Sequence, residues 1–303
     1  MMSSSALLKG EETTPDQGGV MEIRSVGVLG CGLMGSGIAQ VCAASGYRTI
    51  VREVADEVVQ AGLKRIQHAL AESVSKGKMA AETRETTLAK LSGTTRVEDL
   101  TGCDLIIEAI VENLEEKRKV YAAVETVMNE RTIVVSNTSS LSITELAAAT
   151  RRPDRFAGLH FFNPVAAMKL VEVIRALTTS DGTFQSVFAF AASLGKEPIS
   201  APDRPGFIVN RLLVPYLLDA IRQYESGLGT LEDIDKAMKL GCGHPMGPFT
   251  LLDFIGLDTT HYIANIMFEE YRDRQFASPP LLKRMVTAGW LGRKSGRGFY
   301  SYA

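Results

Sequence analysis

A histidine and a glutamate lie within two apolar segments in the middle of the chain. His160 ends the segment RFAGLH, at residues 155–160, and Glu172 lies inside KLVEVI, at residues 169–174. Both segments are typical of buried β-strands. A buried carboxylate without a partner is costly, and a neighbouring histidine would satisfy it and gain basicity. We therefore expect the two strands to be neighbours, with FFNPVAAM as the loop between them.

A pair of this kind can move a proton during the oxidation of an alcohol. The histidine accepts the proton of a hydroxyl group while the adjacent carbon gives up a hydride, and it returns the proton in the reverse reaction. General acid–base catalysis of this kind is typically worth ~10²–10⁴-fold in rate. The alternative is a core histidine that is bonded to a structural acid, and the spacing alone does not separate the two interpretations.

A glycine-rich turn near the start of the chain indicates where a hydride acceptor would bind. Residues 23–29, IRSVGVL, predict a strand, and SGIAQVCAASG predicts a helix that ends near Gly46. A second predicted strand, YRTIVRE, closes on Glu53. Strand, glycine turn, helix, strand and acid together span the ~30 residues of a dinucleotide-binding βαβ unit.

Each glycine of the turn has a separate physical role. Gly30 permits the tight turn, Gly32 lets the backbone approach a pyrophosphate, and Gly35 lets the helix pack closely on the strand. The helix N-terminus adds free N–H groups and a positive dipole end. The predicted cofactor contacts of the turn are Gly30, Gly32, Leu33, Met34 and Gly35. A purely structural glycine turn is the alternative.

The acid at the end of the second strand favours NAD over NADP. Glu53 can accept hydrogen bonds from the adenosine ribose, and its charge would repel a 2′-phosphate. Arg52 weakens this argument because an arginine can hold a 2′-phosphate, but we interpret it as a solvated strand end.

The order of the remaining segments predicts the fold. Further strands are expected at residues 104–110, 132–137, 155–160 and 169–174, mostly separated by helical patterns. This alternation predicts a Rossmann-like, doubly wound, mostly parallel α/β sheet. After residue 205 the apolar residues recur at helical spacing, which predicts an all-α C-terminal domain. The expected divisions are a disordered lead at 1–20, an NAD-binding domain at 21–205 and a helical domain at 206–303.

Composition excludes several classes of function. The net charge of -2 gives no positive electrostatic field that would attract nucleic acid or an anionic membrane. No apolar run is long enough to cross a bilayer. The four cysteines have no metal-ligand spacing, so we expect no metal and reduced thiols. Residues 1–20 resemble neither a secretory signal nor a good transit peptide. We expect a cytoplasmic protein, or a mitochondrial matrix protein if the source is eukaryotic.

Several motifs, in order along the chain, resemble one enzyme family. They are GCGLMGSGIAQ, AIVENLEEK, SNTSSLSIT, GLHFFNPV, MKLVEVI, PGFIVNRLLVPYL and HPMGPF. Together they resemble the 3-hydroxyacyl-CoA dehydrogenase family, which includes short-chain enzymes of β-oxidation and 3-hydroxybutyryl-CoA dehydrogenases. The resemblance runs from about residue 23 to residue 302. It implies NAD-dependent, reversible oxidation of (S)-3-hydroxyacyl-CoA to 3-oxoacyl-CoA such as acetoacetyl-CoA, by a homodimer.

The resemblance also implies roles for residues at the reacting centre. His160 matches the catalytic histidine and Glu172 the carboxylate that orients it. Ser139 matches a residue that touches both substrate and cofactor, and Asn210 an asparagine that places the reacting end of the substrate. From the residues alone, Asn210 would be interpreted as a cap at the domain boundary.

Other matched positions concern the cofactor and coenzyme A. Glu112, Lys117 and Asn163 match positions near the nicotinamide half of NAD, and Lys294 matches a cofactor contact from the C-terminal segment. Lys76 matches a lysine that holds the coenzyme A end of the substrate. Without the resemblance, Glu112 and Lys117 would be interpreted as a solvated helix start.

The chain departs from the family pattern at three places, and two rival functions stay open. Glu53 stands where an aspartate is usual, Ala69 where some relatives have a serine, and Ala166-Ala167 where bulkier residues are common. The last change puts the preferred acyl chain length in doubt. One rival is a related dehydrogenase that acts on a free hydroxy acid, and the other is a non-catalytic NAD-binding structural protein.

Overall fold

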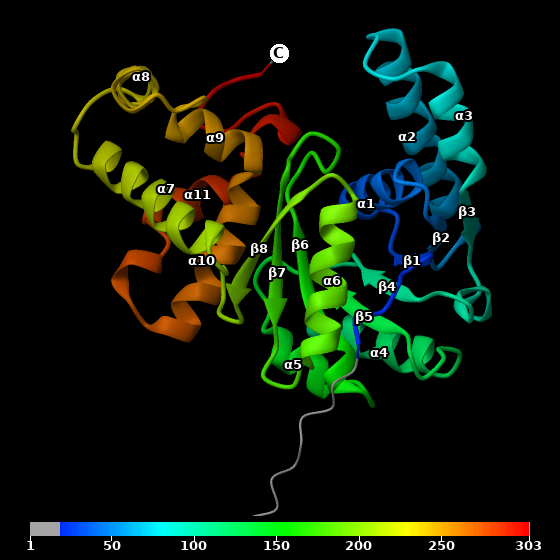
Figure 1. Cartoon of the computed structure of the whole chain (residues 1–303). Coiled ribbons are helices and arrows are strands. Elements are labelled where there is room, and N and C mark those ends of the chain that lie inside the picture. The colour runs from blue at the N-terminus through cyan, green and yellow to red at the C-terminus, as the bar shows by residue number, and fades with distance from the viewer. Residues whose placement is uncertain (1–18, 303) are drawn as a thin grey trace, which may run out of the picture.

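An eight-stranded sheet forms the framework of the N-terminal part of the protein (Figure 1). The structure is a computed structural model in which residues 19–302 are described. The strand order is β3-β2-β1-β4-β5-β6-β7-β8, and all neighbouring strands are parallel except β6 and β7, which are antiparallel. The strands are β1 Ser25–Leu29, β2 Arg48–Arg52, β3 Leu91–Thr94, β4 Leu105–Glu108, β5 Ile133–Ser136, β6 Phe156–Phe161, β7 Leu170–Arg175 and β8 Glu197–Pro202.

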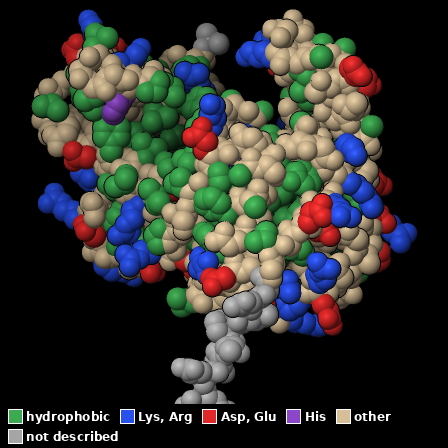
Figure 2. Space-filling view, in the orientation of Figure 1, with side chains coloured by type: hydrophobic (Ala, Val, Ile, Leu, Met, Phe, Trp, Pro, Cys, Tyr) green, Lys and Arg blue, Asp and Glu red, His purple; other side chains and the backbone are tan. Residues whose placement is uncertain are grey.

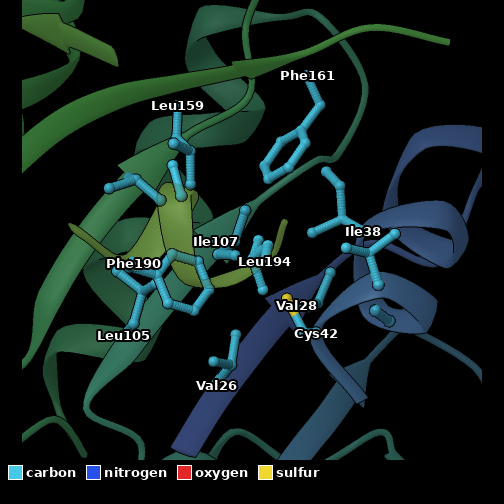
Figure 3. Packing of buried hydrophobic residues seen from close by; sticks show 14 of the residues in the cluster. Val26, Val28, Ile38, Cys42, Leu105, Ile107, Leu159, Phe161, Phe190 and Leu194 are labelled. Atoms are coloured by element: carbon cyan, nitrogen blue, oxygen red, sulfur yellow. The ribbon is translucent and has the colours of Figure 1, made fainter. Parts of the chain in front are cut away.

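Helices cover both faces of this sheet. One core cluster joins the sheet to α1, α2 and α6, and a second joins its other face to α4 and α5. Figure 3 shows part of the first cluster, in which Leu159 and Phe161 of β6 and Ile38 of α1 are among the labelled side chains. The helices of this part are α1 Leu33–Ala44, α2 Asp56–Ser75, α3 Ala81–Ala89, α4 Leu114–Glu125, α5 Ile143–Ala148 and α6 Asp181–Ser193, with short 3₁₀ turns at Val97–Leu100 and Pro153–Arg155.

The C-terminal part is helical and has a core of its own. Its helices are α7 Val209–Glu225, α8 Leu231–Cys242, α9 Pro248–Ile255, α10 Leu257–Tyr271 and α11 Pro280–Thr287, with 3₁₀ turns at Arg274–Phe276 and Arg293–Ser295. Side chains from these helices form a third apolar cluster, separate from the two on the sheet. Gly256, at φ 104°, divides α9 from α10.

The predicted α/β fold class with a helical second part is confirmed, and two strands were not predicted. The strand β3, LSGT, is short and polar, and β8, EPISAP, contains two prolines, so neither has the apolar pattern of a strand. Tertiary pairing makes them strands, since β3 adds to β2 and β8 adds to β7 at the two edges of the sheet. Most of the predicted lead at residues 1–20 lies outside the described residues.

The two parts of the molecule stand on either side of a depression. In Figure 1, α2 and α3 form an arm that projects on one side, and the helical part stands on the other. The space-filling view shows the surface hollowed between them (Figure 2). Among the described residues, no helix has the length and apolar character required to cross a membrane.

Candidate functional site

His160 and Glu172 form a buried pair on adjacent strands. The antiparallel pairing of β6 and β7 places the two residues directly opposite each other in register. The Nδ1 atom of His160 lies 2.7 Å from Oε2 of Glu172, and both side chains are buried. Side chains alternate along a strand, so His160 points to the sheet face opposite Leu159 and Phe161, which belong to the first core cluster. The prediction that the two strands are neighbours is confirmed.

The second oxygen of Glu172 binds the start of the helical part. Its Oε1 accepts hydrogen bonds from the backbone N–H groups of Ile208 and Val209, each at 3.0 Å. With its oxygens engaged in this way, the carboxylate is fixed in place and accepts a hydrogen bond from the N–H group at Nδ1 of His160. This geometry assigns the tautomer in which Nε2 is the free acceptor nitrogen.

Two aromatic side chains flank the imidazole. The ring of Phe162, from the loop after β6, lies 4.5 Å from the ring of His160, and the ring of Phe207 lies 5.6 Å from it. Gly206 and Phe207 both have positive φ, at 84° and 45°, so the chain makes a left-handed turn just before α7. That turn brings the Phe207 ring to the histidine and the next two N–H groups to Glu172.

The backbone of the glycine turn has the shape that a dinucleotide requires. A Cβ atom at Gly30 would lie 2.6 Å from the carbonyl oxygen of Ala109, and one at Gly35 would lie 1.9 Å from the carbonyl oxygen of Gly30. At Gly32, by contrast, no atom lies within 4 Å of the Cβ position. Close packing thus accounts for Gly30 and Gly35, whereas the open space at Gly32 fits the approach of a pyrophosphate.

Glu53 lies beside this turn. Its Oε1 accepts a hydrogen bond from the backbone N–H of Cys31 at 2.5 Å. The carboxylate at the end of β2 is therefore within reach of a ligand on the glycine turn. Leu33 and Met34 form the first turn of α1, where free N–H groups face outward.

Lys117 is buried between two carboxylates, one at the end of β4 and one in the loop that follows. Its Nζ lies 2.6 Å from Oε1 of Glu108 and 3.2 Å from Oε2 of Glu112, and the lysine side chain is only 1% exposed. The interpretation of Glu112 and Lys117 as a solvated helix start is therefore wrong. Lys117 lies on the buried face of helix α4. The two ion pairs offset the cost of removing its ammonium group from water.

Glu112 organises the loop that carries Ser139. Its Oε1 accepts hydrogen bonds from the Thr138 hydroxyl, from the backbone N–H of Ser139 at 3.2 Å and from the Ser140 hydroxyl at 3.1 Å. Burial alone would raise the pKa of Glu112, but the ammonium of Lys117 and these hydrogen bonds outweigh it and hold the pKa below its usual value. The structure thus brings Ser139, Glu112 and Lys117 together.

The remaining predicted site residues lie in four different segments of the chain. Asn210 is in the first turn of α7, next to the Val209 N–H that binds Glu172, and Asn163 is exposed in the β6–β7 loop. Lys294 donates to Oδ2 of Asp258 at 2.7 Å in the helical part. Lys76 ends α2 on the projecting arm and pairs with a glutamate there. Neither lysine contacts the His160–Glu172 pair.

Three further residues that join strands and loops of the site were not predicted. Glu108 also accepts from the Tyr121 and Ser136 hydroxyls, and Asn137 Oδ1 accepts from the backbone N–H of Phe161 at 2.9 Å. Asp203 accepts from the N–H groups of Ile143 and Thr144 and so joins the linker before α7 to α5. Glu108 could have been found, because it is a lone acid in an apolar strand, as Glu172 is. For Asp203 the sequence indicated only a turn, and nothing local indicated its contacts with α5.

The cysteines and the acidic residues offer no metal site in the described part of the chain. Residues 19–302 contain no group of three or more histidine, cysteine, aspartate or glutamate side chains that could hold a metal ion. Burial raises the pKa of the Cys31 thiol, beside the glycine turn, to about 11, so this thiol is protonated at neutral pH.

Comparisons with known proteins agree with this geometry. The family model of the 3-hydroxyacyl-CoA dehydrogenase NAD binding domain matches residues 25–204, and that of the C-terminal domain matches residues 206–302. The 3-hydroxybutyryl-CoA dehydrogenase of Mycobacterium tuberculosis is 48% identical over 92% of this chain and 99% of its own length. The mitochondrial hydroxyacyl-coenzyme A dehydrogenase of Homo sapiens is 48% identical over 92% of this chain and 91% of its own.

A solved structure extends the similarity to three dimensions. The crystal structure of (S)-3-hydroxybutyryl-CoA dehydrogenase from Ralstonia eutropha superimposes with a TM-score of 0.90 at 44% identity, covering 93% of this chain and 100% of the other. Together the two family models span the glycine turn, the His160–Glu172 pair and the helical part. The chain therefore belongs to the 3-hydroxyacyl-CoA dehydrogenase family, with an NAD-binding domain followed by the C-terminal domain of that family.

Proposed function

We propose that the protein catalyses the reversible, NAD-dependent oxidation of (S)-3-hydroxyacyl-CoA to 3-oxoacyl-CoA, with short to medium acyl chains. The observation that carries this proposal is the buried His160–Glu172 pair, 2.7 Å apart, in a chain with the family's two domains. The names of the bacterial relatives favour hydroxybutyryl-CoA as a substrate.

In this reaction His160 is the general acid–base group. Its Nε2 takes the proton of the 3-hydroxyl group during oxidation and returns it to the oxyanion during reduction. Glu172 holds Nδ1 protonated and stabilises the imidazolium that forms when Nε2 accepts its proton. NAD, when bound, supplies the acceptor for the hydride that leaves C3 of the substrate.

The residues around the pair position the two reactants. We assign Ser139 and Asn210 to the reacting end of the substrate, because one lies on the loop held by Glu112 and the other in the first turn of the helix bound by Glu172. Glu112, Lys117 and Asn163 are assigned to the nicotinamide half of NAD and Lys294 to a further cofactor contact. The glycine turn and Glu53 are assigned to the pyrophosphate and the adenosine ribose.

The remaining assignments concern substrate length, assembly and location. Lys76, exposed on the α2–α3 arm, would hold a phosphate of coenzyme A as a point charge. We place the domain boundary at residues 205–206, with the helical domain closing the cleft and forming a homodimer. The small side chains at Ala166-Ala167 would leave room for the acyl chain. A cytoplasmic or mitochondrial matrix location accords with the bacterial and mitochondrial relatives.

The test is the loss of reduced-nicotinamide absorbance when the purified protein meets acetoacetyl-CoA, with NADH and NADPH run side by side. We expect rapid loss with NADH and, in the His160→Gln variant, a rate lower by about 10²-fold or more. A preference for NADPH would overturn the assignment of Glu53. Turnover of a free hydroxy acid in place of the coenzyme A ester would support the first rival function. NADH binding without turnover of either would support the non-catalytic rival.

A further inference from the structure

Lys196, immediately before β8, is a buried cation that binds two backbone carbonyl groups. Its Nζ donates to the carbonyl oxygen of Val165 at 2.5 Å and to that of Met168 at 2.8 Å. The residue is 9% exposed, and the described residues provide it with hydrogen bonds but no ion pair. Both acceptors belong to the loop between β6 and β7, which begins two residues after His160.

A lysine in this environment is costly to keep charged. Burial lowers the pKa of Lys196, which is the expected effect of removing an ammonium from water. Two carbonyl oxygens recover part of the lost hydration, but an apolar side chain at this position would avoid the penalty altogether. The cost is explained if the lysine fixes the loop, because each carbonyl that it binds restrains one side of the same turn.

The loop that Lys196 binds contacts both His160 and helix α1, which follows the glycine turn. At its start, the ring of Phe162 lies 4.5 Å from the ring of His160. In its middle, Val165 is packed so closely on α1 that a Cβ atom at Gly37 would lie 2.9 Å from its side chain. The N–H groups of Ala167 and Met168 both donate to the carbonyl of Pro164, which closes the turn. Movement of this turn would therefore change the contact with the imidazole and the packing against α1.

We propose that Lys196 is a positioning residue for the reaction, whose ammonium holds the β6–β7 loop so that Phe162 stays against His160 and Asn163 stays at the cofactor side. The proposal rests on the proposed dehydrogenase function for its kinetic consequence. Its structural consequence, a fixed loop, does not depend on that function.

The chain offers a matched control for this proposal. Lys169 lies at the other end of the same loop, but its side chain is 79% exposed and its nearest carboxylate, Glu197, is 3.9 Å away. Replacing each lysine by methionine removes one ammonium and keeps a similar side-chain length. Lys196→Arg retains a cation that can donate to both carbonyls and provides the conservative variant.

The experiment compares the wild type with Lys196→Met, Lys196→Arg and Lys169→Met. It measures kcat and KM for acetoacetyl-CoA reduction, NADH affinity by fluorescence titration, and amide hydrogen exchange across residues 162–169. Because a displacement of about 1 Å in an active site can cost on the order of 10²-fold in rate, we expect kcat of Lys196→Met to fall by about 10- to 100-fold. We also expect faster exchange in the loop, with most of kcat recovered in Lys196→Arg and none lost in Lys169→Met.

The outcomes separate this proposal from the proposed function. If Lys196→Met is less stable but keeps the wild-type kcat and loop exchange, Lys196 is only structural and the proposal is wrong. If the wild type does not reduce acetoacetyl-CoA, the proposed function fails, and loop exchange and NADH affinity still decide whether Lys196 holds the loop. Should the methionine variant fail to fold, a Lys196→Gln variant replaces the ammonium by a shorter, neutral amide. Unchanged loop exchange in that variant would refute the proposal that the ammonium holds the loop.

Discussion

Replacing Gly35 or Gly32 of the glycine turn by alanine is expected to have different effects on stability and cofactor binding. The Cβ atom of Gly35→Ala would lie 1.9 Å from the carbonyl oxygen of Gly30 and 2.8 Å from its carbonyl carbon. Both are backbone atoms, so no side chain can rotate to relieve the contact. The Cβ atom of Gly32→Ala meets no atom within 4 Å, and Gly32 has a φ of -67°, which alanine adopts readily.

The magnitudes follow from these contacts. In Gly35→Ala, helix α1 must retreat from β1 by about 1.1 Å before the new contact reaches 3.0 Å, the distance below which such contacts essentially never occur. Overpacking of this kind costs about 1–3 kcal/mol, and we expect the upper end because the contact is with backbone. A cost of about 3 kcal/mol corresponds to a fall in Tm of roughly 6–12 °C for a domain of this size. In Gly32→Ala the stability should change by no more than about 0.5 kcal/mol.

NADH binding should be weakened in both variants, for different reasons. In Gly35→Ala the N-terminus of α1 is displaced from the phosphates. In Gly32→Ala the methyl group occupies the space that the pyrophosphate needs, and a clash of about 1–3 kcal/mol raises Kd by roughly 5- to 160-fold. Thermal unfolding without cofactor and NADH fluorescence titration measure the two effects separately. Wild-type stability in Gly35→Ala would refute the packing argument, and wild-type NADH affinity in Gly32→Ala would refute the placement of the pyrophosphate.

Substitutions at three other residues test the contacts of Glu172, Asp203 and Glu112. Glu172→Gln should lower kcat by about 10²-fold or more and also lower the free energy of unfolding, because the side chain both orients His160 and binds the start of α7; unchanged urea unfolding would contradict the second role. Asp203→Ala should destabilise the protein by about 1–3 kcal/mol, since two N–H groups of α5 lose their acceptor, and Asp203→Asn, which keeps one oxygen, should lose less by the same urea titration. The pKa of Glu112 is lowered in the folded protein, so its stabilising effect is present above the unfolded value of about 4.3 and is lost as the pH falls through the folded value. As the pH falls below about 5, the wild type should therefore lose stability relative to Glu112→Gln, and parallel stability curves would contradict this account.

The strands that local pattern predicted are those that contain consecutive apolar residues. The predicted strands β1, β2, β4, β5, β6 and β7 all bury such residues in the sheet, although β2 begins and ends with an arginine. The glycine turn with α1 follows β1 as predicted. The strands β3 and β8 were missed because their sequences have no such run. They are strands because neighbouring strands leave free N–H and C=O groups at the sheet edges, which only the assembled sheet presents.

The same distinction holds for the site. The short loop between two buried strands was enough to predict the His160–Glu172 pair, because a lone buried acid needs a partner and the histidine was the nearest candidate. Family resemblance supplied Ser139 and Asn210, whose roles no local pattern indicates. Glu112 and Lys117 were misjudged from the residues alone, since charges at a helix start are usually solvated.

The sequence by itself thus determined six of the eight strands, the glycine turn before α1 and the pairing of His160 with Glu172, because each depends on residues close together in the chain. Only the tertiary structure decided that Lys117 and Lys196 are buried and that Glu172 also binds the start of α7. The physical reason is that the environment of a charge is set by whatever surface packs over it. For these side chains that surface comes from segments that are brought together only when the sheet and the helices assemble.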